Sequence, residues 1–575
     1  MLKLFRLLQP FRAAVAIVSV LALAQSLANL FLPRLMGDIV DQGIVPGDTR
    51  RILVIGGQML LVAIVGTICA VAGSFFASKV ATGFGVVVRG RVFDRVSRLS
   101  VHQFDHFSTA SLITRTTNDT TQVQGVLLML LGMAISAPMM AIGGVALSLS
   151  QDARLARVLI AVIPILAVVF FVIMWKAVPL YQLMQVQIDR LNLVLDEGLS
   201  GVRVIRAFDR GAHQSRRFED ANRDVTATAI TVNRLVALLF PAMFFMMNLT
   251  GILIIWFGAG RIDAGEMHVG AMIASLQYAI QILFAVFMVT AVFVMLPRAA
   301  ASAERINQVL DVSPDVNDPA QSRTAAATRG HVEFQNVTFQ YPGAEEPALS
   351  GVSFTARPGE VTAIIGGTGS GKSTLAGLIP RFFDVNEGRL LVGGVDVREL
   401  RQEDLRGTIG FVPQTAVLFS GTIASNIRFG RDHATDDEVG HAAAVAQAAE
   451  FIDQMPDGYA SVVSQGGTNL SGGQKQRLAI ARALVRRAEV YVFDDSFSAL
   501  DFATDARLRA ALKADLSGAT VFIVSQRIGT VMNADRIVVL DDGRVAGIGT
   551  HAALLKTCQV YRQIAQSQAS LEEVA

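Results

Sequence analysis

The hydrophobic residues of this chain are concentrated in six long runs before residue 300, and polar stretches separate the runs. The runs contain no charged side chain and lie at residues 13–33, 52–78, 120–151, 158–175, 235–260 and 269–297. A helix needs roughly 20 apolar residues to cross the hydrocarbon core of a bilayer, and five of the runs reach that length. The fourth is shorter, but it continues past Lys176 without charge through residues 177–188. The pattern predicts six transmembrane helices rather than buried helices of a large soluble domain.

Arginine residues mark two of the loops between these runs. They are Arg89, Arg91, Arg95 and Arg98 after the second run, and Arg203, Arg206, Arg210, Arg216 and Arg217 after the fourth. The opposite loops, at residues 38–48, 151–154 and 261–266, are short and less basic. Because Lys and Arg are enriched in cytoplasmic loops, we expect both long loops and both chain ends in the cytoplasm. The polar-flanked stretches 79–119 and 189–234 can extend the helices well beyond the membrane.

Few polar side chains interrupt the runs. Lys176 follows Arg157 by 19 residues and lies near the expected inner interface, where a lysine can direct its ammonium group into water. We favour this interpretation over a lysine that faces a central cavity and binds an anionic substrate group, which stays open as the alternative. For Asn248, Gln277 and Tyr278 we expect hydrogen bonds between helices.

The composition supports a membrane protein with a second, more polar part. The 575 residues are 52% hydrophobic and 17% charged, which is too apolar for an ordinary soluble protein. A net charge of +2 gives no sign of nucleic-acid binding, and the two cysteines, Cys69 and Cys558, indicate neither a disulfide framework nor a metal site. Residues 311–330 read as a linker, so we expect a membrane domain at 1–310 and a second domain at 331–575.

The second domain begins with a phosphate-binding motif. Residues 331–338 alternate as a strand, and residues 360–365 form a short apolar strand that runs directly into a glycine-rich loop. The loop residues are Gly366, Gly367, Thr368, Gly369, Ser370, Gly371, Lys372, Ser373 and Thr374. The glycines let backbone N–H groups surround phosphates, Lys372 reaches the β- and γ-phosphates, and the Ser373 hydroxyl is a ligand for Mg²⁺. The strand before the motif and the expected helix after it make the interpretation specific.

A second motif identifies the family. Leu470 is followed by Ser471, Gly472, Gly473 and Gln474 and then by Lys475-Gln476-Arg477, which resembles the signature sequence of the ATP-binding cassette (ABC) ATPases. Further residues match that family in order and spacing. They are Tyr341, where the family stacks an aromatic ring on adenine, Gln414 of the Q-loop, Asp494 at the end of the Walker B strand, and Asp501 of the D-loop.

The resemblance covers the whole chain, because six spans ahead of one cassette is the layout of an ABC exporter half-transporter. It implies an all-α six-helix exporter bundle, domain-swapped in the dimer, fused to a cytoplasmic α/β P-loop ATPase domain. It also implies ATP and Mg²⁺ as cofactors, with Ser373, Gln414 and Asp494 around the metal. In this family two cassettes dimerise head to tail, and each ATP lies between the Walker A motif of one chain and the signature of the other.

The family also has coupling helices in its long cytoplasmic loops. Residues 102–109 and 207–218 look like these segments. Arg115, Asn118 and Asp119 keep the family's Arg-x-x-Asn-Asp ending, whereas Ala110-Ser111 replaces the usual Gly-Glu.

Two catalytic positions depart from the family pattern. Asp495 stands where the family has the glutamate that polarises the attacking water, and Gln526 stands where it has a switch histidine. Gln465, before the signature, also replaces an expected glutamate. Aspartate is one methylene shorter, and a misplacement of roughly 1 Å can cost about 10²-fold in rate. Glutamine cannot gain a proton as histidine can. We therefore expect a site that binds ATP but hydrolyses it poorly.

These departures predict a heterodimer in which a different chain carries the Glu and the His, while Ser471 of this chain completes the partner's consensus site. The expected function is ATP-driven export of a hydrophobic or amphipathic compound, a lipid, drug or peptide, across a bacterial inner membrane. Three alternatives remain open. They are a homodimeric exporter with slow hydrolysis, an importer of iron-chelate compounds on the exporter fold, and an ATP-gated regulatory or channel protein.

Overall fold

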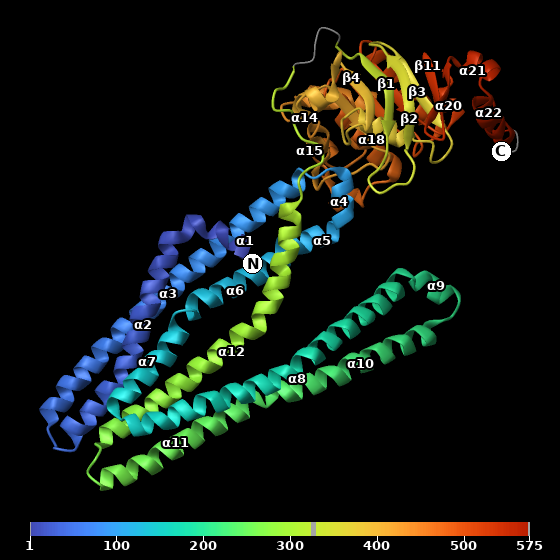
Figure 1. Cartoon of the computed structure of the whole chain (residues 1–575). Helices are drawn as coiled ribbons and strands as arrows, with labels where there is room; N and C mark the ends of the chain where they lie inside the picture. Colours follow the sequence, from blue (N-terminus) through green and yellow to red (C-terminus); the bar gives the residue numbers. More distant parts are fainter. Residues whose placement is uncertain (1, 324–328, 573–575) are drawn as a thin grey trace. The chain divides into compact units, whose positions relative to one another are not determined.

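The computed structural model describes residues 2–323 and 329–572, and the chain forms two compact units (Figure 1). The membrane unit contains Met1–Ser97 and Ser108–Val312, and the cassette unit contains Arg98–Phe107 and Ser313–Ala575. The short segment Arg98–Phe107, from within the expected membrane domain, thus folds with the cassette. Residues 324–328 of the expected linker lie outside the described residues.

The prediction of six transmembrane helices is confirmed. In the described residues, six helical segments are long and apolar enough to span a membrane: Lys3–Ile44, Thr49–Ser97, Thr109–Gln151, Ala153–Ser200, Gly211–Asp263 and Val269–Met288. The helices of the membrane unit are α1 (Leu2–Phe5), η1 (Arg6–Phe11), α2 (Arg12–Ile39), η2 (Val40–Ile44), α3 (Thr49–Ser97), α5 (Thr109–Thr114), η3 (Arg115–Asp119), α6 (Thr120–Met133), α7 (Ser136–Gln151), α8 (Ala153–Ser200), α9 (Val202–Ala207), which lies between the fourth and fifth segments, α10 (Gly211–Ala237), α11 (Leu239–Asp263) and α12 (Val269–Asp311).

Several of these helices are much longer than a membrane requires. The 49 residues of α3 and the 48 of α8 correspond to about 70 Å each at the α-helical rise, so both extend well beyond a bilayer, as expected from their polar flanks. The second expected coupling segment, 207–218, is divided in the structure: α9 ends at Ala207, and α10 begins at Gly211 after a turn. The short helix of this loop is therefore α9, which lies slightly earlier in the chain.

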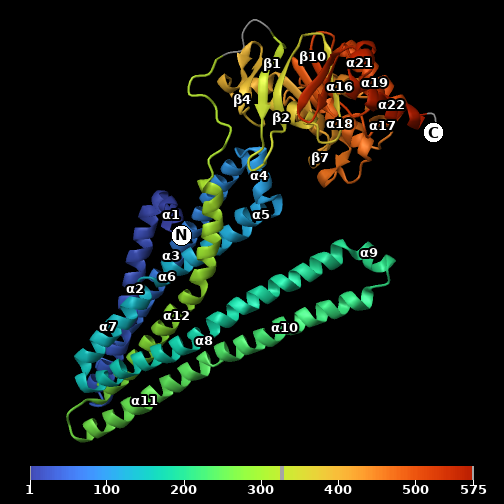
Figure 2. The same cartoon turned by 45° about the vertical axis from the view of Figure 1, so that its right-hand side comes forward.

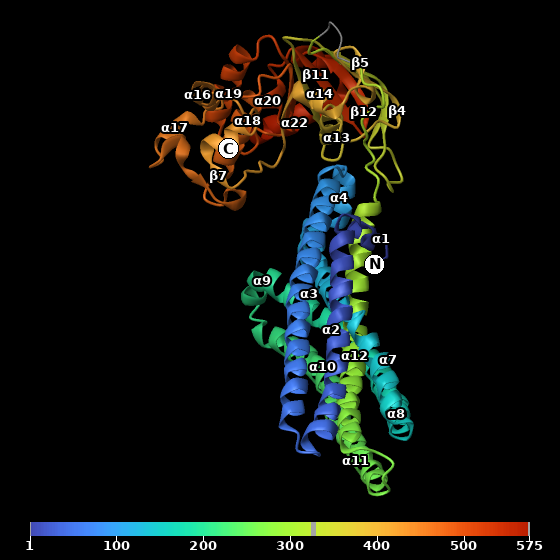
Figure 3. The same cartoon turned by 90° about the vertical axis from the view of Figure 1, so that its left-hand side faces the viewer.

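Within the membrane unit, α2, α3 and α12 run side by side (Figure 3), and α8 lies along α10 and α11 with α9 at one end (Figure 2). Tyr278 of α12 is buried and donates its hydroxyl to the Leu30 carbonyl of α2 at 3.0 Å, which confirms the expected interhelical bond. Asn248 instead donates to Phe244 of its own helix. Lys176 is exposed on α8. Asp119 is buried in the π-helix η3 and pairs with Arg305 of α12, whose Nε donates at 2.8 Å.

The cassette unit is built on two main sheets. The antiparallel sheet has the order β2 (Leu349–Ala356), β1 (Val332–Phe339), β4 (Glu387–Val392) and β5 (Val395–Asp396). The larger sheet has the order β12 (Arg544–Gly549), β11 (Arg536–Asp541), β3 (Val361–Gly366), β10 (Thr520–Val524), β9 (Val490–Asp494) and β6 (Ile409–Val412). A two-stranded ribbon pairs β7 (Gly421–Thr422) with β8 (Val462–Val463).

Helices complete the cassette unit. They are α4 (Val101–Phe107), α13 (Lys372–Leu378), η4 (Val397–Glu399), α14 (Gln402–Gly407), α15 (Ile423–Arg428), α16 (Asp436–Val445), α17 (Ala449–Asp453), η5 (Gly458–Ala460), η6 (Gln465–Gly467), α18 (Gly472–Leu484), α19 (Phe502–Asp515), α20 (Ile528–Val531), α21 (His551–Thr557) and α22 (Gln559–Glu572). Every residue of β9 and β10 is buried, as expected for central parallel strands that are covered on both faces. This core fixes the position of the loops that follow the strands.

Candidate nucleotide site

Four parallel strands of the larger sheet deliver the candidate residues to one edge. In that sheet β10 lies between β3 and β9, with Val524 level with both Ile364 and Asp494, and β6 lies beside β9. The carboxyl ends of parallel strands meet at the same edge, which is where open α/β sheets bind ligands. The glycine-rich loop after β3, the acids at the end of β9, Gln526 after β10 and Gln414 after β6 are therefore neighbours in space.

These neighbours line a cavity of about 360 Å³. Its lining residues are Tyr341, Ala348, Thr368, Gly369, Gly371, Lys372, Ser373, Thr374, Gln414, Asp494, Asp495, Val524, Ser525 and Gln526. Most of the residues proposed from the cassette motifs before the signature are thus brought together in one place, with Asp494, Asp495 and Gln526 from the motifs after it. Gly366, Gly367 and Ser370 belong to the same loop but do not line this cavity.

The glycine-rich loop needs glycine for space as well as for conformation. Gly371 has a φ of 92°, and a Cβ at this position would lie 2.6 Å from the Ala348 carbonyl oxygen. A Cβ on Gly366 would lie 2.2 Å from the Leu540 carbonyl oxygen. The Lys372 ammonium donates to the carbonyls of Gly366 and Gly367 at 3.0 and 2.5 Å, so the loop wraps around it. Burial lowers the pKa of Lys372, and the charges of Asp495 and Asp494 partly oppose that effect.

A hydroxyl and a carboxylate are placed together at the start of α13. The Ser373 hydroxyl donates to the Asp494 carboxylate at 3.1 Å. Burial raises the pKa of Asp494, with the nearby Asp495 charge acting in the same direction and the Ser373 bond acting against it. A buried carboxylate that is costly to ionise gains from a cation, and oxygen ligands are those that Mg²⁺ prefers. Gln414 is exposed at the cavity wall and could add an amide oxygen.

Asp495 occupies an unusual backbone position beside this pair. Its φ is 44°, in the left-handed region that Asp and Asn enter more readily than other side chains. The Asp495 N–H donates to the Val524 carbonyl at 3.0 Å, which joins the end of β9 to the loop after β10. Burial raises the pKa of the Asp495 carboxyl, and the positive charges of Arg527 and Lys372 partly offset this rise.

The loop that carries Gln526 is held by a residue that the sequence did not point to. Gln568 of α22 donates from Nε2 to the Gln526 carbonyl at 2.7 Å, and its Oε1 accepts from the Ile528 N–H at 2.8 Å. Arg527 donates to the Ser498 carbonyl at 3.3 Å and so links this loop to the D-loop. Gln568 belongs to no motif, and a lone glutamine 42 residues beyond Gln526 gives no sequence signal.

Tyr341 also lines this cavity. Its hydroxyl is 3.0 Å from the Thr374 hydroxyl, and its ring packs edge-on against Phe339 and Phe383. These contacts fix the ring beside the glycine-rich loop, where an aromatic face can stack on a base.

The signature and D-loop residues lie elsewhere in the cassette. Ser471 begins α18, where it accepts from the Gln474 N–H at 3.3 Å and donates its own N–H to the Gln474 side chain at 2.9 Å. A Cβ on Gly473 would lie 3.2 Å from the Ala499 carbonyl, so the signature packs closely against the D-loop, and Asp501 caps α19 through the Thr504 N–H at 2.9 Å. Among these described residues none lines the cavity around Lys372. The signature residues and the residues around Lys372 therefore lie at separate places in one chain.

The residues around the cavity fit a nucleoside triphosphate with a divalent cation. The loop would surround an anion with backbone N–H groups at the start of α13, and Lys372 supplies positive charge. Ser373 and Asp494 supply oxygen ligands on the same side of that loop. Tyr341 supplies the flat aromatic surface for a base.

Comparisons with known proteins agree with this arrangement. Residues 15–286 match the family described as "ABC transporter transmembrane region", and residues 349–498 match the family described as "ABC transporter". An uncharacterized ABC transporter ATP-binding protein of Mycobacterium tuberculosis (strain CDC 1551 / Oshkosh) is 42% identical over 98% of this chain and 97% of its own length. An ATP-dependent lipid A-core flippase of Chromobacterium violaceum is 30% identical over 97% of this chain and 95% of its own.

A solved structure extends the similarity to three dimensions. It is a bacterial Atm1-family ABC exporter with ATP bound, with a TM-score of 0.80 and 26% sequence identity. The alignment covers 97% of this chain and 98% of that chain.

Proposed function

This chain belongs to the ABC transporter family as an exporter-type half-transporter, and from that premise we propose that it is the degenerate-site subunit of a heterodimeric exporter. In this proposal its own Walker motifs bind ATP and hydrolyse it poorly. Its signature completes the site of a second, different chain, and hydrolysis there resets the transporter. Hydrolysis of the phosphoanhydride bond of ATP supplies the free energy for transport.

One observation supports this proposal above the others. The cavity around Lys372 has the residues that would hold phosphates and a cation, namely the glycine-rich loop, Ser373, Gln414 and Asp494, but Asp495 and Gln526 line it where a water would be activated. The carboxylate of Asp495 ends one methylene earlier than that of a glutamate, on a residue whose backbone is in the left-handed region. Gln526 can donate a hydrogen bond but carries no charge. Binding and hydrolysis are thereby separated.

A complete site requires a second cassette. Ser471 and the adjacent N–H groups of Gly472 and Gly473 begin α18, away from the cavity, and would contact the γ-phosphate held by another chain. In a homodimer both sites would contain Asp495 and Gln526. A partner with Glu and His gives the assembly one efficient site, which we regard as the reason that this chain retains an intact signature.

The membrane unit supports a dimer with exchanged arms. The helices α8 and α10 form a long pair that ends at α9, and large hydrophobic side chains are exposed on α8, including Val186 and Leu199, and on α9, including Val204. In the proposal α9 and the first turns of α10, which overlap the expected segment 207–218, form one coupling element. The other is α4, which overlaps the expected segment 102–109. The termini and the cassette face the cytoplasm of a bacterial inner membrane.

For the transported compound we propose a lipid or another amphipathic molecule with a long apolar part. The lipid A-core flippase is similar over nearly the whole of this chain, which favours this class over hydrophilic solutes. Lipid flipping in vesicles, measured with labelled lipids against drugs and peptides, would separate the members of the class.

The proposal is tested by ATP turnover of this chain with and without its partner. We expect the purified chain alone to have little ATPase activity and the two-chain complex to be active. After trapping during turnover, uncleaved ATP should be recovered at the site of Lys372 and ADP at the other site. Robust turnover by this chain alone, at the rate of a homodimeric exporter, would contradict the heterodimer, and equal ADP at both sites would contradict the degenerate site.

A further inference from the structure

Residues Ser313–Asp318, which follow the last membrane helix, are held by polar contacts at every residue. On one side this segment contacts α4. Gln103 donates from Nε2 to the Ser313 carbonyl at 2.8 Å and to the Asp315 carboxylate at 2.7 Å, and the Ser100 hydroxyl donates to the other Asp315 oxygen at 3.1 Å. Both oxygens of Asp315 are therefore held by the first turn of α4.

Hydrogen bonds between Ser100 and Gln103 hold these two side chains in position. The Gln103 Oε1 accepts from the Ser100 N–H at 3.2 Å, and the Ser100 hydroxyl accepts from the Gln103 N–H at 3.3 Å. Each of the two side chains thus caps α4 and binds the segment at the same time. A displacement of Asp315 must disturb the start of α4.

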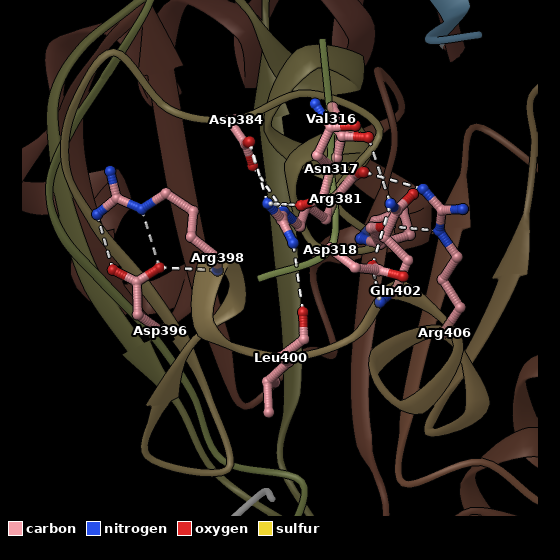
Figure 4. Close-up of polar contacts among 11 residues, drawn as sticks. Val316, Asn317, Asp318, Arg381, Asp384, Asp396, Arg398, Leu400, Gln402 and Arg406 are labelled. Carbon is pink, nitrogen blue, oxygen red and sulfur yellow. Dashed lines mark hydrogen bonds and ion pairs between the residues drawn. The ribbon is translucent and has the colours of Figure 1, made fainter. Parts of the chain in front are cut away.

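On its other side the same segment contacts the cassette (Figure 4). Arg381 donates to the Asn317 carbonyl at 3.1 Å. The Gln402 N–H donates to the Asp318 carboxylate at 2.9 Å, and its side chain donates to the Val316 carbonyl at 3.4 Å. Figure 4 shows these bonds converging from α14 and from the loop after α13 on three consecutive linker residues.

Arg381 connects the segment to the nucleotide site. It follows α13, whose first residue is Lys372, and its φ of 54° and its N–H bond to the Leu378 carbonyl at 2.9 Å close the end of that helix. The Arg381 residue is only 3% exposed, and its guanidinium also pairs with Asp384 at 2.7 Å and donates to the Leu400 carbonyl at 3.3 Å. Few alternative positions are open to a buried guanidinium with this many partners. A movement at the end of α13 would therefore displace Asn317 through Arg381.

We propose that Ser313–Asp318 is a relay between the P-loop helix and α4, with Asp315 and Arg381 as its positioning residues. The relay runs from α13 through Arg381 to Asn317, and from Asp315 through Gln103 to α4. In the chain, α4 follows α3, and Ser313–Asp318 follows α12. The relay would therefore connect the cassette to two membrane helices. This inference rests on the proposed ATP-driven transporter and adds a route of coupling to it.

The test compares hydrogen–deuterium exchange with and without a non-hydrolysable ATP analogue and Mg²⁺, on the full-length chain in its assembled complex. In the wild-type protein we expect the analogue to slow exchange in the P-loop (366–374) and to change exchange in residues 98–107. In Asp315→Ala the change in the P-loop should persist and ATP affinity should stay within about twofold. The analogue-dependent change at residues 98–107 should fall by at least half.

Two further variants control for simple loosening. Gln103→Ala removes the bonds of Gln103 to Ser313 and Asp315 but leaves the Ser100 bond. It should reproduce the result of Asp315→Ala, even if one of the two variants is unstable. Asp311→Ala removes a nearby carboxylate whose partner is the exposed Lys3, and it should leave both changes at the wild-type level. A purely structural fastening would alter exchange equally with and without the analogue, leaving the difference intact.

The outcomes distinguish a failure of the relay from a failure of the proposed nucleotide site. An unchanged difference at residues 98–107 in both Asp315→Ala and Gln103→Ala would overturn the relay, as would a wild-type protein in which only the P-loop responds. A wild-type P-loop that does not respond to the analogue would instead overturn the proposed nucleotide site.

Discussion

Gln568 donates a hydrogen bond from its side-chain amide to the main-chain oxygen of Gln526 at 2.7 Å, and it accepts one from the Ile528 N–H. A hydrogen bond of this kind contributes about 1 kcal/mol. We expect Gln568→Ala to speed amide exchange at Ile528 about fivefold, measured by mass spectrometry on short peptides. The loop that carries Gln526 would then be less well ordered at the cavity wall.

Two variants make this first prediction specific. Gln568→Glu keeps an acceptor for the Ile528 N–H but places a carboxylate against the Gln526 carbonyl, so it should preserve protection at Ile528 while weakening the hold on Gln526. Gln563→Ala changes an exposed glutamine of the same helix and should have no effect on either peptide. Equal protection of Ile528 in Gln568→Ala and wild type would show that water replaces the bond at no cost.

A second prediction concerns the stability of the cassette and its dependence on pH. Burial raises the pKa of Asp495, so the folded protein binds its proton more tightly than the unfolded chain does. The ionised carboxylate therefore destabilises the fold at neutral pH, and this penalty disappears below the unfolded pKa of about 3.9. Asp495→Asn should raise the melting temperature of the nucleotide-free protein by about 1–3 °C at pH 7. The gain should shrink as the pH approaches 4.

The matched control is Asp457→Asn, which neutralises an exposed carboxylate in the same unit. The difference in melting temperature between Asp457→Asn and wild type should be close to zero at every pH in this range. Asp and Asn have nearly the same shape, so the expected stabilisation by Asp495→Asn comes from the lost charge. A stabilisation that was the same at pH 4 and pH 7 would contradict this electrostatic explanation.

Much of the fold could be predicted because its signals are local. Charge-free runs gave the six membrane helices, and the strand before Gly366 with the motif after it gave the nucleotide-binding domain. The parts that could not be predicted depend on distant contacts. Three examples are the left-handed backbone of Asp495, the hydrogen bond from Gln568 and the two hydrogen bonds to the Asp315 carboxylate. These residues are of common types, and no motif in the neighbouring sequence indicates their contacts. Composition alone described residues 311–330 as a linker, whereas contacts with α4 and α14 fix part of that stretch.

A third prediction restores the two altered positions. The double variant Asp495→Glu with Gln526→His returns the longer carboxylate and the titratable ring to the cavity. If distance is what limits hydrolysis, this variant should convert the site of Lys372 into one that accumulates ADP after trapping, with a rise in turnover there of up to about 10²-fold. The left-handed backbone at residue 495 is less favourable for Glu than for Asp, so a modest loss of stability should accompany the gain.

Each single variant serves as a control for the other. Gln526→His alone leaves the carboxylate short, and Asp495→Glu alone leaves the ring absent, so each should give less ADP at this site than the double variant. Uncleaved ATP in the double variant, at the wild-type level, would mean that another group of the cassette, such as Gln465, limits hydrolysis.

The fourth prediction compares two changes within this one chain, whose effects should be opposite in order to those expected for a homodimer. Asp495→Asn removes a carboxylate from a site that contributes little to turnover, so the two-chain complex should retain most of its ATPase activity. Ser471→Arg places a bulky side chain at the start of α18, where the wild-type hydroxyl and the helix N–H groups would face the partner's nucleotide. The loss of one such electrostatic donor costs about 10²–10³-fold in turnover, and steric blockage adds to it. Both rates are measured on the same reconstituted complex, with Ser498→Ala as a control for a nearby hydroxyl that bonds to the Asp495 carbonyl in its own loop. In a homodimer each site must hydrolyse its own ATP, so neutralising the acid after Asp494 is the more damaging change. If the Asp495→Asn complex were inactive and the Ser471→Arg complex active, the assignment of the two sites would be reversed.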